Sequence, residues 1–400
     1  RVLFRSELNA EGLDEKIVEG QIRQIQPLEE SGKQPWGIFL LEFKNADAFA
    51  KGRGLTGPLR KVLRGLVPKK LRQSNKPVWK RENLLFICTT HNYEHYRFAY
   101  FKTPKESLLA PLATFGWGPD IPCRTACEFN LPALEWPQNP DDAEGWVKQW
   151  QAAFDKEKLT EVFFEEYKDI FDAFEKDLIK QTKDRIWAHD YALQFLNRCM
   201  FIYFIQRKGW LNDDTNFFRT FWKAYGGSNP KKDTFFENWL MALFFEAFNK
   251  KFPGGCKYFP QEINIALQQA PYLNGGLFKE NDLDRKDGFI VDDERFKKIH
   301  EFLERFNFTV SEDTPLDKDV AVDPEMIGMV YETLVNKSDD EDERSEAGIF
   351  YTPRIEIDLM CRLSLVDNLA NHLGQEHKTL LYNWIFSYDP TSKSQNDTAV

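Results

Sequence analysis

The stretch YALQFLNRCMFIYFIQ, residues 191–206, decides the fold of the middle of the chain. Apolar side chains occur on most sides of a helix built from it, and a helix that is apolar nearly all round is a buried one. Gly209 follows shortly afterwards and is a typical stop signal. We therefore predict a central helix buried inside a larger helical domain.

The residues before this stretch have the same helical period. Apolar side chains recur there at steps of three and four, at Leu159, Val162, Phe163, Tyr167, Ile170, Phe171, Phe174 and Leu178. Such spacing gives a helix one apolar face that must pack on something. We predict a mainly α-helical spacer domain over residues 141–310.

The first 140 residues have a different pattern and predict a mixed α/β domain. A helix at 57–67, introduced by Gly57 and Pro58, is expected to cross between strands, and residues 132–144 are expected to be a linker. Short runs rich in β-branched and aromatic residues are the strand candidates: Ile17–Ile25, Trp36–Phe43, Leu84–Thr89 and Tyr96–Lys102. The predicted class is therefore α+β.

The last part of the chain begins with a charged linker, predicted over residues 311–347. It holds a short helix around Met326–Val335 and an acidic run at 338–346 that is too polar to fold alone, so we expect a mobile tether. A final amphipathic helix is predicted after Pro353.

Bulk composition limits the class of protein. The 400 residues carry a net charge of -10, so contact with a polyanion must come from local basic patches. We find no apolar run of about 18 residues and no secretory signal, and we expect a cytoplasmic protein that does not enter membranes. The 6 cysteines form no dense framework, which predicts reduced thiols. Because the chain opens on Arg1 instead of Met, we expect it to be a fragment.

Three blocks point to a family. They are residues 196–211 (LNRCMFIYFIQRKGWL), residues 271–278 (PYLNGGLF), and a set running from Phe306 through Val322-Asp323-Pro324 to Gly348-Ile349-Phe350-Tyr351-Thr352-Pro353. Their order and spacing resemble the large single-chain DNA methyltransferases of type IIG restriction-modification systems and their relatives in phage defence. The resemblance covers roughly residues 185–365.

This resemblance implies that residues 348–400 begin a Rossmann-like methyltransferase domain. Its opening loop would help to bind S-adenosylmethionine through Gly348, Phe350, Tyr351, Thr352 and Pro353. The residue types suit that role, because glycine permits close approach, proline suits the start of a helix, and threonine offers a capping hydroxyl.

The rest of the family's active site is absent from these residues. The resemblance calls for a glycine-rich Asp-Pro-x-x-Gly-x-Gly turn and for an Asn-Pro-Pro-Tyr motif that receives a flipped adenine. Asp389-Pro390 is followed by no glycine, and Asn229-Pro230 is followed by Lys231. We thus expect no catalytic residues and no activity in this chain alone, and DNA adenine-N6 methylation by the intact enzyme. Its expected partners are double-stranded DNA and other subunits of a defence system.

A metal-dependent nuclease is a rival reading. Glu42 and Lys44 have the Glu-x-Lys spacing that places both side chains on one strand face, where such enzymes hold Mg²⁺. These nucleases also need an upstream Asp, and neither Asp14 nor Glu19 is at a convincing place. A solvent-exposed strand face is the simpler explanation.

A third reading is a non-catalytic DNA-binding or assembly module. Six basic residues suit a phosphate-tracking surface, although a solvated helix face is equally consistent: Arg60, Lys61, Arg64, Lys69, Lys70 and Arg72. The pair His91 and His95 is expected in a hairpin turn between two strands, and the pair Cys123 and Cys127 lacks the tight spacing of a zinc site, so we predict no metal there.

Overall fold

The computed structural model describes most of the chain. The described residues are 2–3, 22–24, 35–43, 46–49, 59, 63, 83–102, 112–119, 121–273, 276–310, 317–335 and 354–387. They belong to two compact units, a first unit of Arg1–Asp323 and a second unit of Pro324–Val400.

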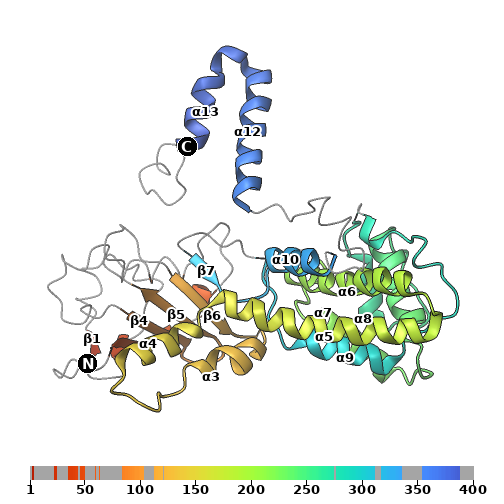
Figure 1. Ribbon diagram of the computed structural model, residues 1–400, viewed down its shortest axis with the longest axis horizontal. Helices are drawn as coiled ribbons and strands as arrows, with labels where there is room; N and C mark the ends of the chain where they lie inside the picture. Colours follow the sequence, from red (N-terminus) through yellow and green to blue (C-terminus); the bar gives the residue numbers. More distant parts are fainter. Residues whose placement is uncertain are drawn as a thin grey trace. The chain divides into compact units, whose positions relative to one another are not determined.

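The first unit contains a mixed β-sheet whose described strands follow one another in chain order (Figure 1). Two neighbouring pairs are parallel, β3 with β4 and β6 with β7, and the other pairs are antiparallel. The strands are β1 (Val2–Leu3), β2 (Ile22–Gln24), β3 (Trp36–Phe43), β4 (Asn83–Thr90), β5 (Tyr96–Lys102), β6 (Leu112–Trp117) and β7 (Asp317–Asp319).

The central strands β3 and β4 are buried along nearly their whole length. Helix α4 (Ala143–Ala152) packs on one face, where Trp150 lies 5.3 Å from Trp36 between ring centroids. The side chain of Gln151 donates to the Tyr100 hydroxyl at 2.7 Å on the same face. The strands predicted at 36–43, 84–89 and 96–102 are thereby confirmed, and of the strand predicted at 17–25 the structure describes only 22–24 as strand.

A parallel pair of adjacent strands needs a crossover connection, and the predicted helix at 57–67 lies between β3 and β4 in the sequence. Two of its residues are described, Leu59 and Leu63, and both are helical and buried. A spacing of four residues puts both side chains on the same face of a helix, as an apolar contact requires.

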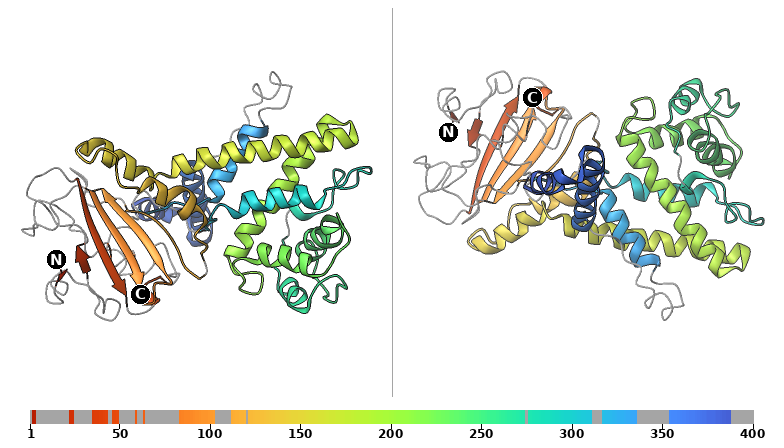
Figure 2. Two further views of the ribbon diagram at one scale, coloured as in Figure 1. Left: turned by 90° about the horizontal axis from the view of Figure 1, so that it is seen from below. Right: turned by 90° about the horizontal axis from the view of Figure 1, so that it is seen from above.

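The helical part of the first unit follows the sheet along the chain (Figure 2). Its helices are α5 (Lys156–Thr182), α6 (Arg185–Arg207), α7 (Phe217–Gly227), α8 (Gln261–Gln268) and α9 (Asp293–Glu304), with two π-helical segments, η5 (Phe236–Leu240) and η6 (Ala242–Phe248). The α-helix preceding α4 is α3 (Leu131–Ala133), which follows the π-helical segment η4 (Ala126–Asn130).

Helix α6 is the buried central helix that the sequence predicts. Its buried side chains include Tyr191, Leu193, Leu196 and Ile205, which lie on several sides of the helix. On α5 the predicted apolar face is buried at its core positions, whereas Val162 is exposed at its margin. The helix α6 ends at Arg207, two residues before the predicted stop, and Gly209 takes a φ of 75° that favours glycine.

The second unit consists of α10 (Pro324–Val335), α12 (Arg354–Leu373), the 3-10 turn η8 (Gln375–His377) and α13 (Lys378–Ser387). Helices α12 and α13 form a hairpin around a small core of Val366, Ala370 and Leu381. The short helix predicted at 326–335 and the helix predicted after Pro353 are both present. Within the described parts of both units, no helix has the length and apolar character needed to cross a membrane.

The prediction that all cysteines are reduced is wrong for one pair. Cys123 and Cys127 are joined by a disulfide at the start of η4. Their Cα atoms are 5.8 Å apart, one helical turn along the chain, which is within the reach of a disulfide. The other four, Cys88, Cys199, Cys256 and Cys361, are free.

Candidate functional site

All the residues that the sequence predicts for cofactor and DNA binding lie outside the described part of the chain. This holds for the whole loop Gly348, Phe350, Tyr351, Thr352 and Pro353, and for the basic residues Arg60, Lys61, Arg64, Lys69, Lys70 and Arg72. The described chain resumes at Arg354 with helix α12, directly after the loop. The roles of these residues in cofactor binding and DNA binding therefore stay predictions.

Glu42 is the candidate catalytic residue that the structure does describe. It lies near the carboxyl end of β3, opposite Thr89 of the parallel strand β4, and its side chain is buried. The hydroxyl of Tyr93 donates to Glu42 Oε1 at 3.1 Å. A buried carboxylate costs free energy unless it is paired, so this position differs from the solvent-exposed strand face that the simpler explanation assumed. Lys44 lies outside the described residues.

The turn between β4 and β5 brings Tyr93 to Glu42. Thr90 donates to the side chain of Asn92 at 2.5 Å, and Tyr93 takes a φ of 57°, which is uncommon for a residue with a side chain. The sequence predicts a hairpin turn here between His91 and His95, and the structure confirms it. The pairing of Tyr93 with Glu42 was not predictable, because 51 residues separate the two.

Residues of the first two family-like blocks meet in a buried cluster. The guanidinium of Arg198, on α6, donates to both carboxylate oxygens of Asp284 at 2.6 and 3.0 Å. Its Nε donates to the Leu277 carbonyl at 2.6 Å. The side chain of Arg198 is almost fully buried and also lies 5.1 Å from the centre of the Phe245 ring. These blocks therefore hold the loop after η6 on the central helix.

The third block contributes a second buried ion pair. Asp323 is fully buried, and Lys156 Nζ, at the start of α5, lies 2.6 Å from its Oδ2. One member of each pair, Arg198 or Asp323, could have been suspected from the sequence, because it is a charged residue with apolar neighbours. Their partners were not predictable, since they lie far along the chain.

A metal site receives no support from the described residues. They contain no group of three or more His, Cys, Asp or Glu side chains placed to hold an ion. His95 instead packs its ring 5.3 Å from that of Phe49, and Cys123 and Cys127 are bonded to each other.

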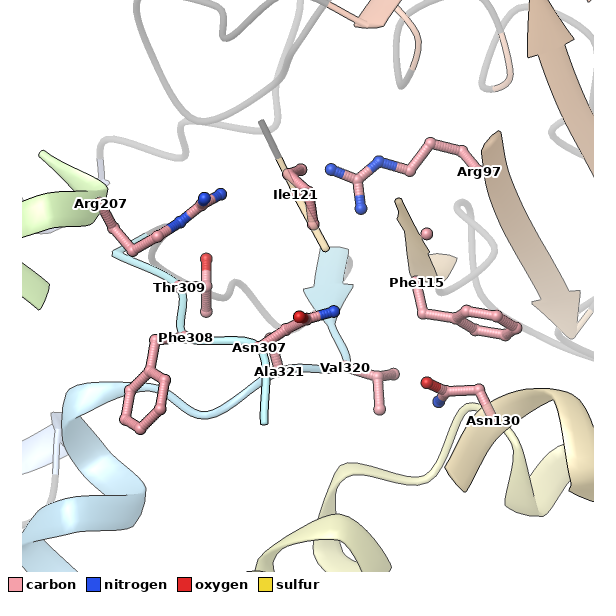
Figure 3. Close-up of a pocket in the computed structure, with 11 residues that line it drawn as sticks. Arg97, Phe115, Ile121, Asn130, Arg207, Asn307, Phe308, Thr309, Val320 and Ala321 are labelled. Carbon is pink, nitrogen blue, oxygen red and sulfur yellow. The ribbon is translucent and has the colours of Figure 1, made fainter. Parts of the chain in front are cut away.

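A small pocket that sequence reasoning missed lies between the sheet and the helical part of the first unit. Its volume is about 30 Å³, and Arg97 of β5 and Arg207 at the end of α6 both line it. Figure 3 shows the two guanidinium groups facing each other across Ile121, with the Thr309 hydroxyl beside Arg207. No sequence pattern links two arginines that are so far apart along the chain.

Comparison with known proteins finds one distant likeness of use here. Over 255 residues the chain is 28% identical to a protein of Methanocaldococcus jannaschii named "Putative type II restriction enzyme and methyltransferase RM.MjaORFECS2P". The match spans 57% of this chain and 21% of that protein, so the chain covers about a fifth of its relative. No family model matches the chain, and no solved structure matches it.

The likeness supports a relation to restriction-modification proteins. That is also the group of proteins to which the blocks at 196–211, 271–278 and 306–353 pointed. The relative's name does not specify which base is methylated, which cofactor is used or which residues act.

Proposed function

We propose that the chain is the amino-terminal part of an S-adenosylmethionine-dependent DNA adenine-N6 methyltransferase of a restriction-modification or phage-defence system. The observation that carries this proposal is the distant likeness to a restriction enzyme and methyltransferase, together with the three ordered blocks. In this proposal the loop at 348–353 forms one wall of the cofactor site. The helical part of the first unit is a spacer between that site and the sheet.

The buried pairs of the first unit support the spacer role. Arg198 with Asp284, and Lys156 with Asp323, are contacts within the protein that hold helices and loops together. Charged residues that pair with each other inside the protein hold helices and loops in place, so we assign the chemistry on the substrate to other residues. The absence of the Asn-Pro-Pro-Tyr motif from the sequence agrees with this division.

The test uses the natural protein that contains this chain, with duplex DNA and radiolabelled S-adenosylmethionine. We expect label in N6-methyladenine, and we expect Tyr351→Ala to lower kcat/KM for the cofactor at least about tenfold, the equivalent of ~1.4 kcal/mol of lost binding. Tyr382→Ala, which removes an exposed ring on α13, is the matched control and should leave the rate unchanged. Label in cytosine, or none in DNA, would refute the proposal.

A second candidate is a Mg²⁺-dependent nuclease at the sheet, and one observation favours it. Glu42 is a buried carboxylate at the carboxyl end of a parallel strand pair, the edge at which α/β sheets place ligands. Its carboxylate would hold Mg²⁺, and Lys44 would orient the attacking water. The Tyr93 hydroxyl would orient the carboxylate by its hydrogen bond.

This candidate is tested by incubating the same natural protein with plasmid DNA and Mg²⁺. Cleavage should fall at least about a hundredfold in Glu42→Gln and Lys44→Ala, because each removes a group needed at the metal. Glu376→Gln, at a side chain that is 73% exposed, should cleave as the wild type does. Equal cleavage by all four proteins would exclude a site at Glu42.

A further inference from the structure

The disulfide between Cys123 and Cys127 lies where it can be reached from solvent. Cys127 is an exposed residue, and Cys123 is half-buried. A disulfide is broken by a thiolate that attacks one of its two sulfur atoms, so access to the bond is the first requirement for exchange with other thiols. The exposure of Cys127 meets that requirement, which a disulfide inside a protein core would not.

The other four cysteines are free and differ in their access to thiol chemistry. Cys88 and Cys199 are fully buried, and burial raises the pKa of both thiols far above the usual range. Such a thiol supplies almost no thiolate, which is the reactive form. Cys361 is exposed and Cys256 is half-buried, and neither is bonded. Exchange at the disulfide can therefore be compared with exposed and with buried thiols of the same chain.

The disulfide closes a very short loop, since the two cysteines are 4 positions apart. The entropy that a disulfide removes from the unfolded chain grows with the length of the loop that it closes. A bond across so short a loop contributes little to the stability of the whole fold in this way. The folded protein can thus survive reduction of the bond, which a reversible switch requires.

The turn closed by the disulfide contacts the end of α9. Arg124 Nη2, on the turn, lies 2.7 Å from Glu304 Oε2. The hydroxyl of Thr125, a buried residue, accepts from the Asn307 amide at 2.5 Å and donates to the Arg305 carbonyl at 3.4 Å. We call these contacts between residues 124–125 and residues 304–307 the clasp. The clasp joins the sheet of the first unit to its helical part.

The clasp also holds the last segment of the first unit. The Val322 amide donates to the Asn307 carbonyl at 2.8 Å, and the Thr309 amide donates to the Val322 carbonyl at 2.8 Å. The first unit ends at the next residue, Asp323, and α10 of the second unit begins at Pro324. Asn307 is therefore bonded both to the disulfide-closed turn and to the strand of chain that enters the second unit.

We propose that Cys123 and Cys127 are a reversible thiol–disulfide switch for small monothiols such as glutathione, and that reduction loosens the clasp. A thiolate attacks Sγ of Cys127, the bond to Cys123 breaks, and Cys123 leaves as a thiolate that takes up a proton. A second thiolate attacks the incoming sulfur of the mixed disulfide, which releases Cys127 to be protonated. The pair gains two electrons and two protons, and the two small thiols lose them and leave as their disulfide.

The switch goes beyond the proposed function and does not depend on it. Its expected effect is local, because the disulfide fixes the turn that carries Thr125. Without the covalent closure this turn can move, and the hydrogen bond to the Asn307 amide opens more often. Exchange of that amide with solvent measures the opening.

The first measurement uses the natural protein that contains this chain, folded and equilibrated at graded ratios of reduced to oxidised glutathione. Differential alkylation and peptide mass spectrometry give the redox state of each cysteine. We expect Cys123 and Cys127 to change state together, in one transition that follows the square of the reduced glutathione concentration, as a two-electron couple requires. Cys361→Ser, which removes an exposed free thiol, is the matched control and should leave the transition unchanged.

The second measurement is hydrogen exchange at Asn307 in the oxidised and the reduced protein. Reduction should speed exchange of this amide at least about tenfold, while the amides of α6 keep their protection. Thr125→Val removes the acceptor hydroxyl and keeps the shape of the side chain, so it should exchange fast in both redox forms. The variant thereby shows whether the disulfide acts through Thr125.

Each result supports or overturns a defined part of the proposal. A pair that stays bonded at every glutathione ratio in the folded protein, or one that stays reduced at every ratio, overturns the exchange site. Equal exchange at Asn307 in the two redox forms overturns the effect on the clasp. Loss of protection in α6 upon reduction would show that the disulfide supports the whole fold, and this also overturns the switch. None of these measurements requires methyl transfer, so their outcome is independent of the proposed function.

Discussion

Single residues of the family-like blocks act here through burial and pairing. Arg198 illustrates this, since almost its whole side chain is buried and all its described contacts are within the protein. A sequence comparison can mark such a residue as important. Only the structure distinguishes a residue that holds a loop from one that touches a substrate.

Replacing Arg198 should therefore destabilise the protein strongly. Arg198→Met leaves Asp284 buried without its partner, which typically costs about 3 to 5 kcal/mol of unfolding free energy. Urea denaturation followed by circular dichroism measures the loss. Arg285→Ala, whose ion pair with Asp282 is exposed in the same segment, should change the free energy by less than ~1 kcal/mol. A small loss in Arg198→Met would show that the pair is not important for stability.

His300 should make stability depend on pH. Burial lowers the pKa of its ring from 6.5 to about 4, while Glu304 nearby opposes the shift and Arg124 and Arg219 add to it. Above pH 6.5 both folded and unfolded chains carry a neutral ring. As the pH falls from 6.5 towards 4, the unfolded chain binds a proton that the folded chain does not, so stability is lost.

The loss from His300 should approach ~3 kcal/mol at pH 4, on the basis of 1.36 kcal/mol for each unit of pKa shift. His300→Phe fits the aromatic surroundings of Phe218 and Phe296 and should flatten this part of the curve. Urea denaturation at a series of pH values provides the measurement. His377→Phe, at a half-exposed ring, should retain the wild-type pH dependence, and equal curves for all three proteins would contradict the argument.

At the scale of elements, helices were predicted more fully than the sheet. The spacing between Leu159 and Leu178 and the apolar stretch at 191–206 correspond to α5 and α6, because a helical period is a local property of the sequence. The π-helical turns η5 and η6 were not predicted. Their hydrogen bonds span five residues instead of four, and no residue pattern at Phe236–Phe248 distinguishes the two.

Strand pairing and the candidate site could be predicted only in part. Trp36–Phe43 was recognised as a strand, but the short strand β7 at 317–319 gains its structure by pairing with β6 far earlier in the chain. Glu42 was found from its spacing to Lys44. The pocket lined by Arg97 and Arg207 was not found, since only the fold brings these two residues to the same place.

The long helix α5 offers a test at this scale. Asp155 is its N-cap, and the carboxylate accepts hydrogen bonds from the amides of Glu157 at 3.0 Å and Lys158 at 3.4 Å. Asp155→Ala should lower the unfolding free energy by about 1 kcal/mol, because these amides lose their acceptor. Asp155→Asn keeps a side-chain acceptor and should lower the unfolding free energy by only a few tenths of about 1 kcal/mol. Thermal or urea unfolding that ranks the two variants equally would exclude a capping role.

At the scale of the whole molecule, the two units differ in how much core they contain. In the first unit the helix α6 is buried among many aromatic side chains, whereas the α12–α13 hairpin has a core of three buried residues. Several large apolar side chains of α12 and α13, including Leu359, Met360 and Trp384, are exposed. Local stability follows the apolar contacts that each segment makes.

Hydrogen exchange should therefore separate the units. Backbone amides of α12 and α13 should exchange at least about a hundredfold faster than those of α6, equivalent to ~2.7 kcal/mol of local stability. Mass spectrometry of peptides from a deuterium-labelled chain measures both sets in one sample. Val366→Ala should speed exchange in the hairpin and leave α6 unchanged, whereas equal protection in both segments would contradict the argument.

The parallel pair β6–β7 also has a consequence for synthesis on the ribosome. Leu112 to Thr114 pair with Asp317 to Asp319. This edge of β6 therefore stays unpaired until β7, about 200 residues later in the chain, has been synthesised. At 5 to 20 residues per second that delay is about 10 to 40 s. An open strand edge can pair with other chains during this time. Nascent chains of this protein should thus depend on chaperones until residue 319 has emerged.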